Sequence, residues 1–311
     1  MQYKPEGYRI GTPENHEGLC TQNALERSLE RGRILESTAL LCDSDFTLHF
    51  DLVGICGEMP RSEVQYSPAD EETKDIAVLT RVGKPTCFKI IGFRRKENGE
   101  KVAILSRRAA QIECYHNYIR TLIPGDILAA RITHMESFGV FADIGCGMIA
   151  LMPIDSISVS RISHPRDRFR TGDRIYALCR TIDASGRIYL SGRELYGTWQ
   201  ENASRFAVGQ TVMGVVRSLE NYGIFIELAP NLAGLAEPKE GVEVGTRAAV
   251  YIKSILPDRM KIKLVIIDTH TNEGEIPPPV YFIDTKKTFH IDRWQYSPPS
   301  CPKLIDSRFD M

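Results

Sequence analysis

The sequence predicts an all-β protein built from small five-stranded barrels in tandem. Two observations carry this prediction. Residues 125–144 match residues 209–228 without a gap, at a constant offset of 84 residues. Each copy continues with three further short apolar runs, which Gly, Asp and Asn turns separate. Five strands in so short a segment favour a closed barrel, because closure leaves no exposed sheet edge, whereas a sandwich normally needs about seven strands.

The repeat and its turn residues divide the chain into segments. In chain order these are an N-terminal helical segment (1–33), a degenerate barrel (34–108), a linker helix (109–121), a first full barrel (122–195), a second full barrel (206–268) and a C-terminal tail (269–311). We expect a short helix over 12–32 that ends at Gly32, and another over 192–205 between the full barrels. Prolines prevent the tail from forming any long regular element.

Each full copy is expected to form an OB-fold-like barrel. Its first two strands come from the matched segments, and the remaining strands are 149–154, 172–183 and 186–191 in the first copy and 233–238, 245–256 and 260–265 in the second. The first copy also carries a longer insert at 156–170. In the degenerate copy, Phe46 and His49 stand at the two aromatic positions of the full copies. The strand pattern is therefore kept, while most of the residues that distinguish the full copies are lost.

Both full copies carry the pattern aromatic-Gly-x-Phe, in Phe138-Gly139-x-Phe141 and in Tyr222-Gly223-x-Phe225. Side chains three apart on a regular strand face opposite sides of the sheet. We therefore expect each glycine to form a β-bulge that turns both rings to the outer face. Two exposed rings on one face make a platform on which unpaired bases stack. The alternative is that one or both rings belong to the core.

Arginine is concentrated in residues 161–193. This stretch contains three acidic residues, no lysine and eight arginines, namely Arg161, Arg166, Arg168, Arg170, Arg174, Arg180, Arg187 and Arg193. Guanidinium groups suit the forked binding of phosphates, so beside a stacking platform this stretch indicates an RNA-facing groove; a solvated charged surface is the alternative. Arg131 and Arg217 are also candidates for phosphate contacts, with ordinary surface charge as the alternative.

The stretches FGVFADIG, IALMPIDSIS, GDRIYALCRTID and GRIYLS together resemble the S1-type RNA-binding domain, an OB-fold repeat of ribosomal and ribonucleolytic proteins. The stretches NYGIFIEL, AGLAEP, VYIKSIL and MKIKL of the second copy are similar. The resemblance covers residues 122–268, with the degenerate copy before it, and the whole arrangement resembles short bacterial proteins similar to ribosomal protein S1.

The resemblance implies a nucleic-acid face of two aromatics, a histidine on the third strand, and an aspartate and an arginine around the last turn. In the first full copy it implies Phe138, Phe141, Asp183 and Arg187, while Pro153 stands where the histidine is expected. In the second full copy it implies Tyr222, Phe225 and Lys261, while Glu237 and Pro257 replace the histidine and the aspartate. The first full copy is therefore expected to be the stronger RNA site.

The function that follows is single-stranded RNA binding, to mRNA or in association with the ribosome during translation. The degenerate copy at 34–108 is expected to dock on the small ribosomal subunit. One alternative is a protein-interaction scaffold, in which Trp294 and Tyr296 of the tail serve a partner or pack back onto a barrel. A nuclease accessory is a weaker alternative, because the seven histidines are scattered and the repeats leave no room for a catalytic domain.

Composition agrees with a globular cytoplasmic protein that is not an enzyme. Of the 311 residues, 42% are hydrophobic and 25% are charged, and the net charge is −1. The eight cysteines show no CxxC spacing, so we expect buried, reduced thiols, no metal site and no cofactor. The N-terminus is polar, and no apolar run approaches the roughly 20 residues that a membrane-spanning helix needs.

Overall fold

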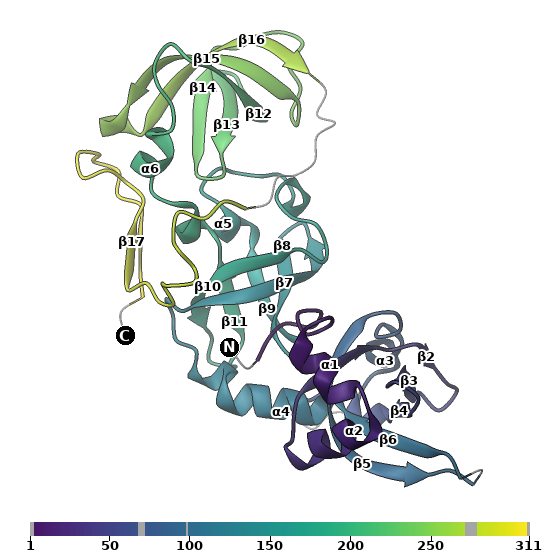
Figure 1. Ribbon diagram of the computed structural model, residues 1–311. Helices are drawn as coiled ribbons and strands as arrows, with labels where there is room; N and C mark the ends of the chain where they lie inside the picture. Colours follow the sequence, from purple (N-terminus) through teal and green to yellow (C-terminus); the bar gives the residue numbers. More distant parts are fainter. Residues whose placement is uncertain (1–2, 68–71, 98, 271–278, 310–311) are drawn as a thin grey trace. The chain divides into compact units, whose positions relative to one another are not determined.

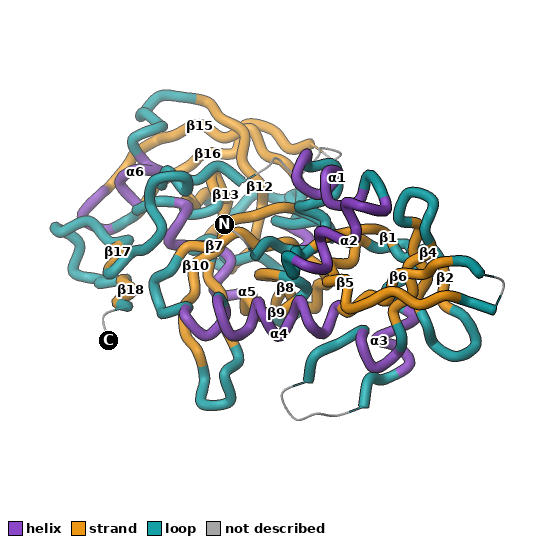
Figure 2. The backbone as a smooth tube through the Cα atoms, turned by 60° about the horizontal axis from the view of Figure 1, so that its bottom comes forward, coloured by secondary structure: helices purple, strands orange, loops and turns teal. Residues whose placement is uncertain are grey.

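The computed structural model describes residues 3–67, 72–97, 99–270 and 279–309. Strands dominate it, and the helices are short (Figure 1; Figure 2). The chain forms two compact units, which are Met1–Leu122 with Asp143–Ile149 and Ile123–Ala142 with Ala150–Met311. Unit 1 contains a six-stranded sheet, and unit 2 contains the larger part of two closed five-stranded barrels. The prediction of tandem OB-fold barrels is confirmed.

Unit 1 holds the degenerate copy and the N-terminal helices. Its strands are β1 (Leu35–Thr38), β2 (Leu41–Cys42), β3 (Leu48–Asp51), β4 (Cys56–Met59), β5 (Pro85–Arg95) and β6 (Lys101–Ser106). Its helices are α1 (Pro13–Leu19), α2 (Gln22–Glu30), α3 (Asp75–Leu79), α4 (Arg107–Asn117) and the 3-10 turns η1 (Arg61–Glu63) and η2 (Ile119–Thr121). The single helix expected over 12–32 is two helices, because the Thr21 side chain accepts a hydrogen bond from the Ala24 amide and caps a new N-terminus.

The sheet of unit 1 is open and has the strand order of a barrel whose first strand is split. Its order is β1-β5-β6-β4-β3-β2, so the two edge strands β1 and β2 follow one another in the chain. β1 pairs with β5, and β2 pairs with β3. In a closed barrel of this type one continuous first strand would pair with both of these neighbours. Leu48, Phe50 and Phe88 fill the core beneath it. The degenerate copy therefore keeps the barrel frame but not its closure.

A buried ionic cluster lies within unit 1. Glu6 Oε1 accepts from Arg107 Nε at 2.6 Å, and Glu6 Oε2 accepts from Arg81 at 2.6 Å. Burial opposes the charge of Glu6, but the two guanidinium groups outweigh burial and lower the pKa of its carboxyl to about 2. Asp143 accepts from the Glu6 amide at 2.7 Å, and burial together with the Glu6 charge raises the pKa of Asp143 to about 7.

Unit 2 holds most of the two full copies, and both barrels have the strand order of the sheet in unit 1. The first barrel consists of β7 (Ile127–Glu136), β8 (Gly139–Gly145), β9 (Met148–Pro153), β10 (Arg174–Ile182) and β11 (Ile188–Ser191). The second consists of β12 (Thr211–Glu220), β13 (Gly223–Ala229), β14 (Leu232–Ala236), β15 (Arg247–Leu256) and β16 (Lys261–His270). Along β16 exposed and buried residues alternate, which is the period of a strand with one face in the core. The expected five strands per full copy are confirmed.

Short helices and turns lie within and between these barrels. They are α5 (Ile154–Ile157), η3 (Pro165–Asp167), η4 (Arg193–Tyr196), α6 (Trp199–Ala203) and η5 (Pro257–Arg259). The helix expected over 192–205 is thus a 3-10 turn followed by a short α-helix. Thr198 and Glu201 form a reciprocal capping box that starts this helix, and Trp199 is buried in the core of the second barrel.

The insert at 156–170 packs against the second barrel. The Val159 amide donates to Asn231 Oδ1 at 3.0 Å, and the Ser160 amide donates to the Pro230 carbonyl at 3.1 Å. Asn231 is fully buried and also donates to the carbonyls of Arg193 and Gly197. The insert therefore serves as a connection between the two barrels of unit 2.

The C-terminal tail folds back onto the second barrel. Its only regular elements in the described residues are β17 (Arg293–Gln295) and β18 (Asp306–Arg308), which pair with each other. Trp294 and Tyr296 are buried in the core cluster of that barrel, and the Tyr296 hydroxyl donates to the Asn231 carbonyl at 2.6 Å. Packing onto a barrel is thus the correct alternative for these two rings. Residues 271–278 of the expected tail lie outside the described residues.

All eight cysteines lie within the described residues and are free thiols, but only half of them are buried as expected. Cys87, Cys114, Cys146 and Cys179 are buried. Among the described residues, none of the helices has the length and apolar character that crossing a membrane requires.

Candidate nucleic-acid interface

The two aromatic rings of the first full copy meet at the hairpin between β7 and β8. Phe138 lies in the two-residue turn of this hairpin and is 54% exposed, while Phe141 lies two residues into β8 and is half-buried. Their ring centroids are 6.0 Å apart and the ring planes are at 89°, an edge-to-face arrangement. Both rings therefore belong to one surface, as expected.

The β-bulge expected at the glycine is wrong, although its consequence holds. Phe138 and Tyr222 lie in turns, where the two-residue period of a strand does not apply. In the second copy the pairing runs without a shift through Glu220 and Gly223, and the irregularity lies between Val216 and Ser218. The glycine is needed for another reason, because the backbone of the neighbouring strand passes over it. A Cβ on Gly223 would lie 2.6 Å from the carbonyl oxygen of Ala236.

A third ring extends the first pair, and sequence reasoning missed it. His134 of β7 stacks on Phe141 with ring centroids 6.1 Å apart and ring planes at 27°. Its side chain is 62% exposed, and its Nε2 lies 2.6 Å from Glu136 Oε1. We call His134, Phe138 and Phe141 the first platform. The repeat gave no signal for it, because the residue at the same offset in the second copy is Ser218.

The second platform has two rings only. Tyr222 is 68% exposed and Phe225 is half-buried, with ring centroids 6.2 Å apart and ring planes at 89°. Ser218 stands opposite Phe225, so the second barrel has no ring where the first has His134. The two hairpins repeat the same geometry, but the stacking area of the first is larger.

Asp183 and Arg187 lie at the turn between β10 and β11. Asp183 Oδ1 accepts hydrogen bonds from the Arg187 amide and the Ser185 amide, both at 2.9 Å, and from the Ser185 hydroxyl at 2.7 Å. These donors, the Ser185 side chain foremost, lower the pKa of the Asp183 carboxyl. Asp183 therefore holds the turn in shape, while the Arg187 side chain is exposed beside it.

The remaining cations predicted for the interface lie in different surroundings. Arg131 of β7 is half-buried, and its Nε lies 3.5 Å from the Gly172 carbonyl oxygen. Lys261 is exposed at the start of β16. Pro153, which stands where the resemblance implies a histidine, ends β9, and its Cα would lie 3.0 Å from a Cβ on Gly139.

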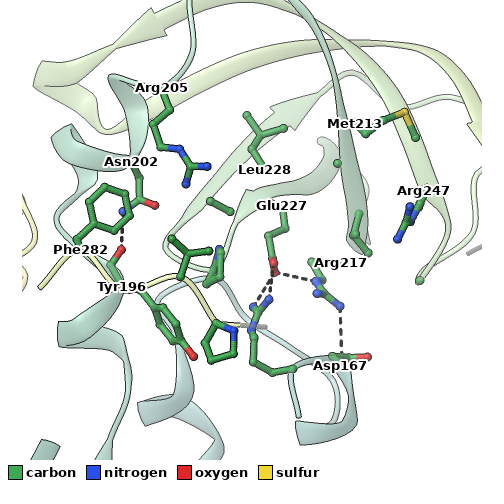
Figure 3. A pocket seen from close by; sticks show the side chains of 18 of the residues that line it. Asp167, Tyr196, Asn202, Arg205, Met213, Arg217, Glu227, Leu228, Arg247 and Phe282 are labelled. Carbon is green, nitrogen blue, oxygen red and sulfur yellow. Dashed lines mark hydrogen bonds and ion pairs between the residues drawn. The ribbon is translucent and has the colours of Figure 1, made fainter. Parts of the chain in front are cut away.

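Arg217 is not on an exposed surface, which corrects its expected place among the phosphate contacts. Its Nε donates to Glu227 Oε2 at 2.8 Å, its Nη1 lies 3.5 Å from Asp167 Oδ2, and the side chain is only 11% exposed (Figure 3). Arg168 of the insert shares the same carboxylate through Nη1 at 2.6 Å. This cluster lines a cavity of about 630 Å³ within unit 2. Arg168 of the insert thus forms an ion pair with the second barrel and does not line an open groove.

The other arginines of residues 161–193 divide into two groups. Arg180 and Arg193 bind Ser156 and Glu194 within the barrel region. The exposed members are Arg161, Arg166, Arg170, Arg174 and Arg187. The expected RNA-facing groove is therefore reduced to the exposed arginines, which leave a positively charged surface on the first barrel and its insert.

The family described as the S1 RNA binding domain matches residues 121–193. The chain is 28% identical to the small ribosomal subunit protein bS1 of Leuconostoc lactis over 231 residues, which are 69% of this chain and 52% of that protein. It is 24% identical to the bS1 homolog of Bacillus cereus over 251 residues, which are 79% of this chain and 63% of that protein. The chain thus spans between about half and two thirds of the length of these relatives.

One similar protein carries an enzyme name. The 4-hydroxy-3-methylbut-2-enyl diphosphate reductase of Clostridium acetobutylicum is 25% identical over 205 residues, which are 62% of this chain but 30% of that protein.

Proposed function

Because the chain is of the S1 type, with an S1 RNA binding domain at residues 121–193, we propose that it binds single-stranded mRNA and works with the ribosome in translation. The supporting observation is the first platform, where three adjacent rings lie at one hairpin of this domain. Unpaired bases stack on such rings, and each stack contributes roughly 1–3 kcal/mol whatever the base.

The site favours single strands over duplexes for a geometric reason. In a duplex the base faces are covered by neighbouring base pairs, and RNA readers that use stacking act on splayed, unpaired bases. Phe138 stands at the tip of a turn and is more than half exposed, so its ring can reach a base from the side. The exposed arginines of the same barrel, such as Arg187, add attraction for the backbone phosphates.

The two barrels are expected to contribute unequally. The second platform keeps two rings but has no counterpart of His134, and Arg217 beside it is held by Glu227. RNA is therefore bound mainly by the first barrel, with the second extending the contact.

The test is a titration of fluorescently labelled RNA with the full chain. An unstructured single strand and a hairpin duplex of equal length are compared at several salt concentrations. The proposal expects tight binding of the single strand, weaker binding of the duplex, and affinity that falls as salt rises. Equal affinity for both would contradict it.

A separate surface of unit 1 supports docking on protein. Large apolar side chains are exposed at the break between β1 and β2 and beside α3, namely Leu40, Leu41, Ile76, Leu79 and Val82. The bridge between Ala39 and Val82 brings the two segments side by side. Exposed apolar patches of this kind mark protein-interaction sites, and we assign this one to the small ribosomal subunit.

Co-sedimentation with small ribosomal subunits tests this assignment. The double variant Leu40→Ser/Ile76→Ser is expected to lose association with the subunit while it keeps its affinity for short single-stranded RNA. A variant that sediments like the wild-type protein would show that the apolar patch is not the docking surface.

A further inference from the structure

Three side chains with metal-binding atoms converge in unit 1. His49, Cys56 and Glu58 each offer one ligand atom, and these atoms all lie within 4.8 Å of one another. They come from the hairpin of β3 and β4, where His49 pairs directly with Glu58 and Asp51 pairs with Cys56. Because alternate residues of paired strands share a face, the three side chains lie on the same face of the sheet.

The imidazole of His49 is already oriented for a metal. Its Nε2 lies 2.7 Å from Asp43 Oδ2, and the other oxygen of Asp43 accepts from the Thr47 and Asp45 amides. A carboxylate partner at Nε2 favours the proton on that nitrogen, which leaves the Nδ1 lone pair directed elsewhere. Nδ1 lies 3.9 Å from Cys56 Sγ. A histidine that binds a metal commonly donates the N–H of its other ring nitrogen to a carboxylate, which fixes the orientation of the ring.

The distances need little adjustment. Zinc bonds to sulfur and nitrogen in a tetrahedral site place neighbouring ligand atoms roughly 3.3–3.8 Å apart. The separation of 3.9 Å between Cys56 Sγ and His49 Nδ1 is near that range, and the ligand atom of Glu58 lies within 4.8 Å of the other two ligand atoms. Thiolate, imidazole and carboxylate together are a donor set that Zn²⁺ accepts, with water as a fourth ligand.

Two cations accompany the carboxylate of Glu58. Lys96 Nζ lies 3.0 Å from Oε1, and Arg94 binds Oε2. Burial opposes the charge of Glu58, but these two cations outweigh burial and lower the pKa of its carboxyl, so the carboxylate is ionised. An ionised carboxylate has about four acceptor positions, which allows a metal and a cation to share it. The side chain of Lys96 is 35% exposed and can turn toward solvent.

The position of this cluster in the barrel frame explains its presence. His49 pairs with Glu58 of the third strand as Phe225 of the second platform pairs with Leu235. The cluster therefore occupies the outer face that carries the aromatic platform in the full copies. Where those copies present rings and apolar side chains for bases, the degenerate copy presents a histidine, a thiol and a carboxylate.

We propose that His49, Cys56 and Glu58 bind a zinc ion, with Asp43 as the residue that positions His49. The ion links the two strands of the β3–β4 hairpin in the degenerate copy, whose first strand is split. Binding displaces the thiol proton of Cys56, so affinity rises with pH. The spacing of the cysteines hid this site, because its ligands meet only across a hairpin.

Cobalt is the probe, because Co²⁺ takes tetrahedral zinc sites and reports a thiolate ligand by its charge-transfer absorption. The full chain is treated with chelator and then titrated with Co²⁺, followed by Zn²⁺ in competition. We expect one equivalent to produce tetrahedral and thiolate bands that Zn²⁺ removes. We expect Cys56→Ser to abolish the thiolate band, and Cys20→Ser, a matched change in the same unit, to keep it. We expect Asp43→Asn to keep the band but weaken affinity about 10–100-fold.

The circular dichroism of each metal-free variant shows whether it is folded. If Cys56→Ser fails to fold, Glu58→Gln replaces it, with the expectation of weaker binding and an altered tetrahedral spectrum. The absence of a thiolate band in the saturated wild-type protein, or a band that survives Cys56→Ser, would overturn the proposal.

Discussion

Gly139 lies under the backbone of Met152: a Cβ on the glycine would be 2.4 Å from the Met152 carbonyl oxygen. Gly223 repeats this relationship with Ala236 in the second barrel. In both barrels the third strand passes close to the first residue of the second strand. That residue directly follows the platform ring in the turn, which is Phe138 or Tyr222. The glycine thus allows the close approach that sets the position of Phe138.

Replacing this glycine is expected to destabilise unit 2. In Gly139→Ala the neighbouring strand must move, at a cost of about 1–3 kcal/mol in the free energy of unfolding. Urea unfolding measures the change. Gly92→Ala is the control, because a Cβ on Gly92 meets nothing within 4 Å. Equal losses in the two variants would show that the close approach does not matter.

His134 is expected to contribute to RNA binding through its ring. His134→Ala removes the surface stacked on Phe141, so the affinity for single-stranded RNA should fall by about 1 kcal/mol or more, the lower end for one base stack. His134→Phe keeps a flat ring and should retain most of the affinity. The titration described above measures both variants. If the two weaken binding equally, the charge or hydrogen bond of His134 matters rather than its ring.

Arg187 and Arg217 should respond in different assays. Arg187→Ala removes an exposed cation, so RNA binding should weaken and the salt dependence of log K should fall by about 0.7 for one phosphate contact. Arg217→Ala removes a partner of the buried Glu227, so the free energy of unfolding should fall by about 3 kcal/mol. Denaturation and RNA titration on both variants check this. A stable Arg217→Ala protein with weak RNA binding would restore Arg217 to the interface.

The stability of unit 1 at acidic pH should depend on Glu6. Its folded pKa of about 2 lies below the ordinary value of 4.5, so its contribution is fully present above pH 4.5 and is lost as the pH falls toward 2. Glu6→Gln should lower stability at neutral pH and make the acid limb of the stability curve shallower. Thermal melting from pH 7 to pH 2 measures this. Glu14→Gln, at an exposed position, should leave the acid limb unchanged.

Much of the fold follows from the sequence, because the repeat reports strand order directly. The five strands of each full barrel and the neighbouring rings at each hairpin come from local pattern and from the offset between copies. The split of the first strand into β1 and β2 does not, since no local signal separates a broken strand from a short one.

The site residues that were misplaced depend on contacts distant in sequence. Arg217 pairs with Asp167 and Glu227, and only the packing of the insert on the second barrel brings these groups together. In the sequence His134 is one of seven scattered histidines, and only the fold brings its ring onto Phe141. Charge and spacing in the sequence identify candidate residues, but burial decides which of them face a ligand.

The most direct test of the central claim removes the two phenyl rings of the first platform. In the RNA titration, Phe138→Ala/Phe141→Ala is compared with Tyr222→Ala/Phe225→Ala and with Ile149→Ala, an exposed apolar control on the same barrel. Two lost stacks of roughly 1–3 kcal/mol each predict at least a tenfold loss of affinity in the first variant. We expect a smaller loss in the second variant and none in the control. Wild-type affinity in the folded Phe138→Ala/Phe141→Ala protein would contradict the account.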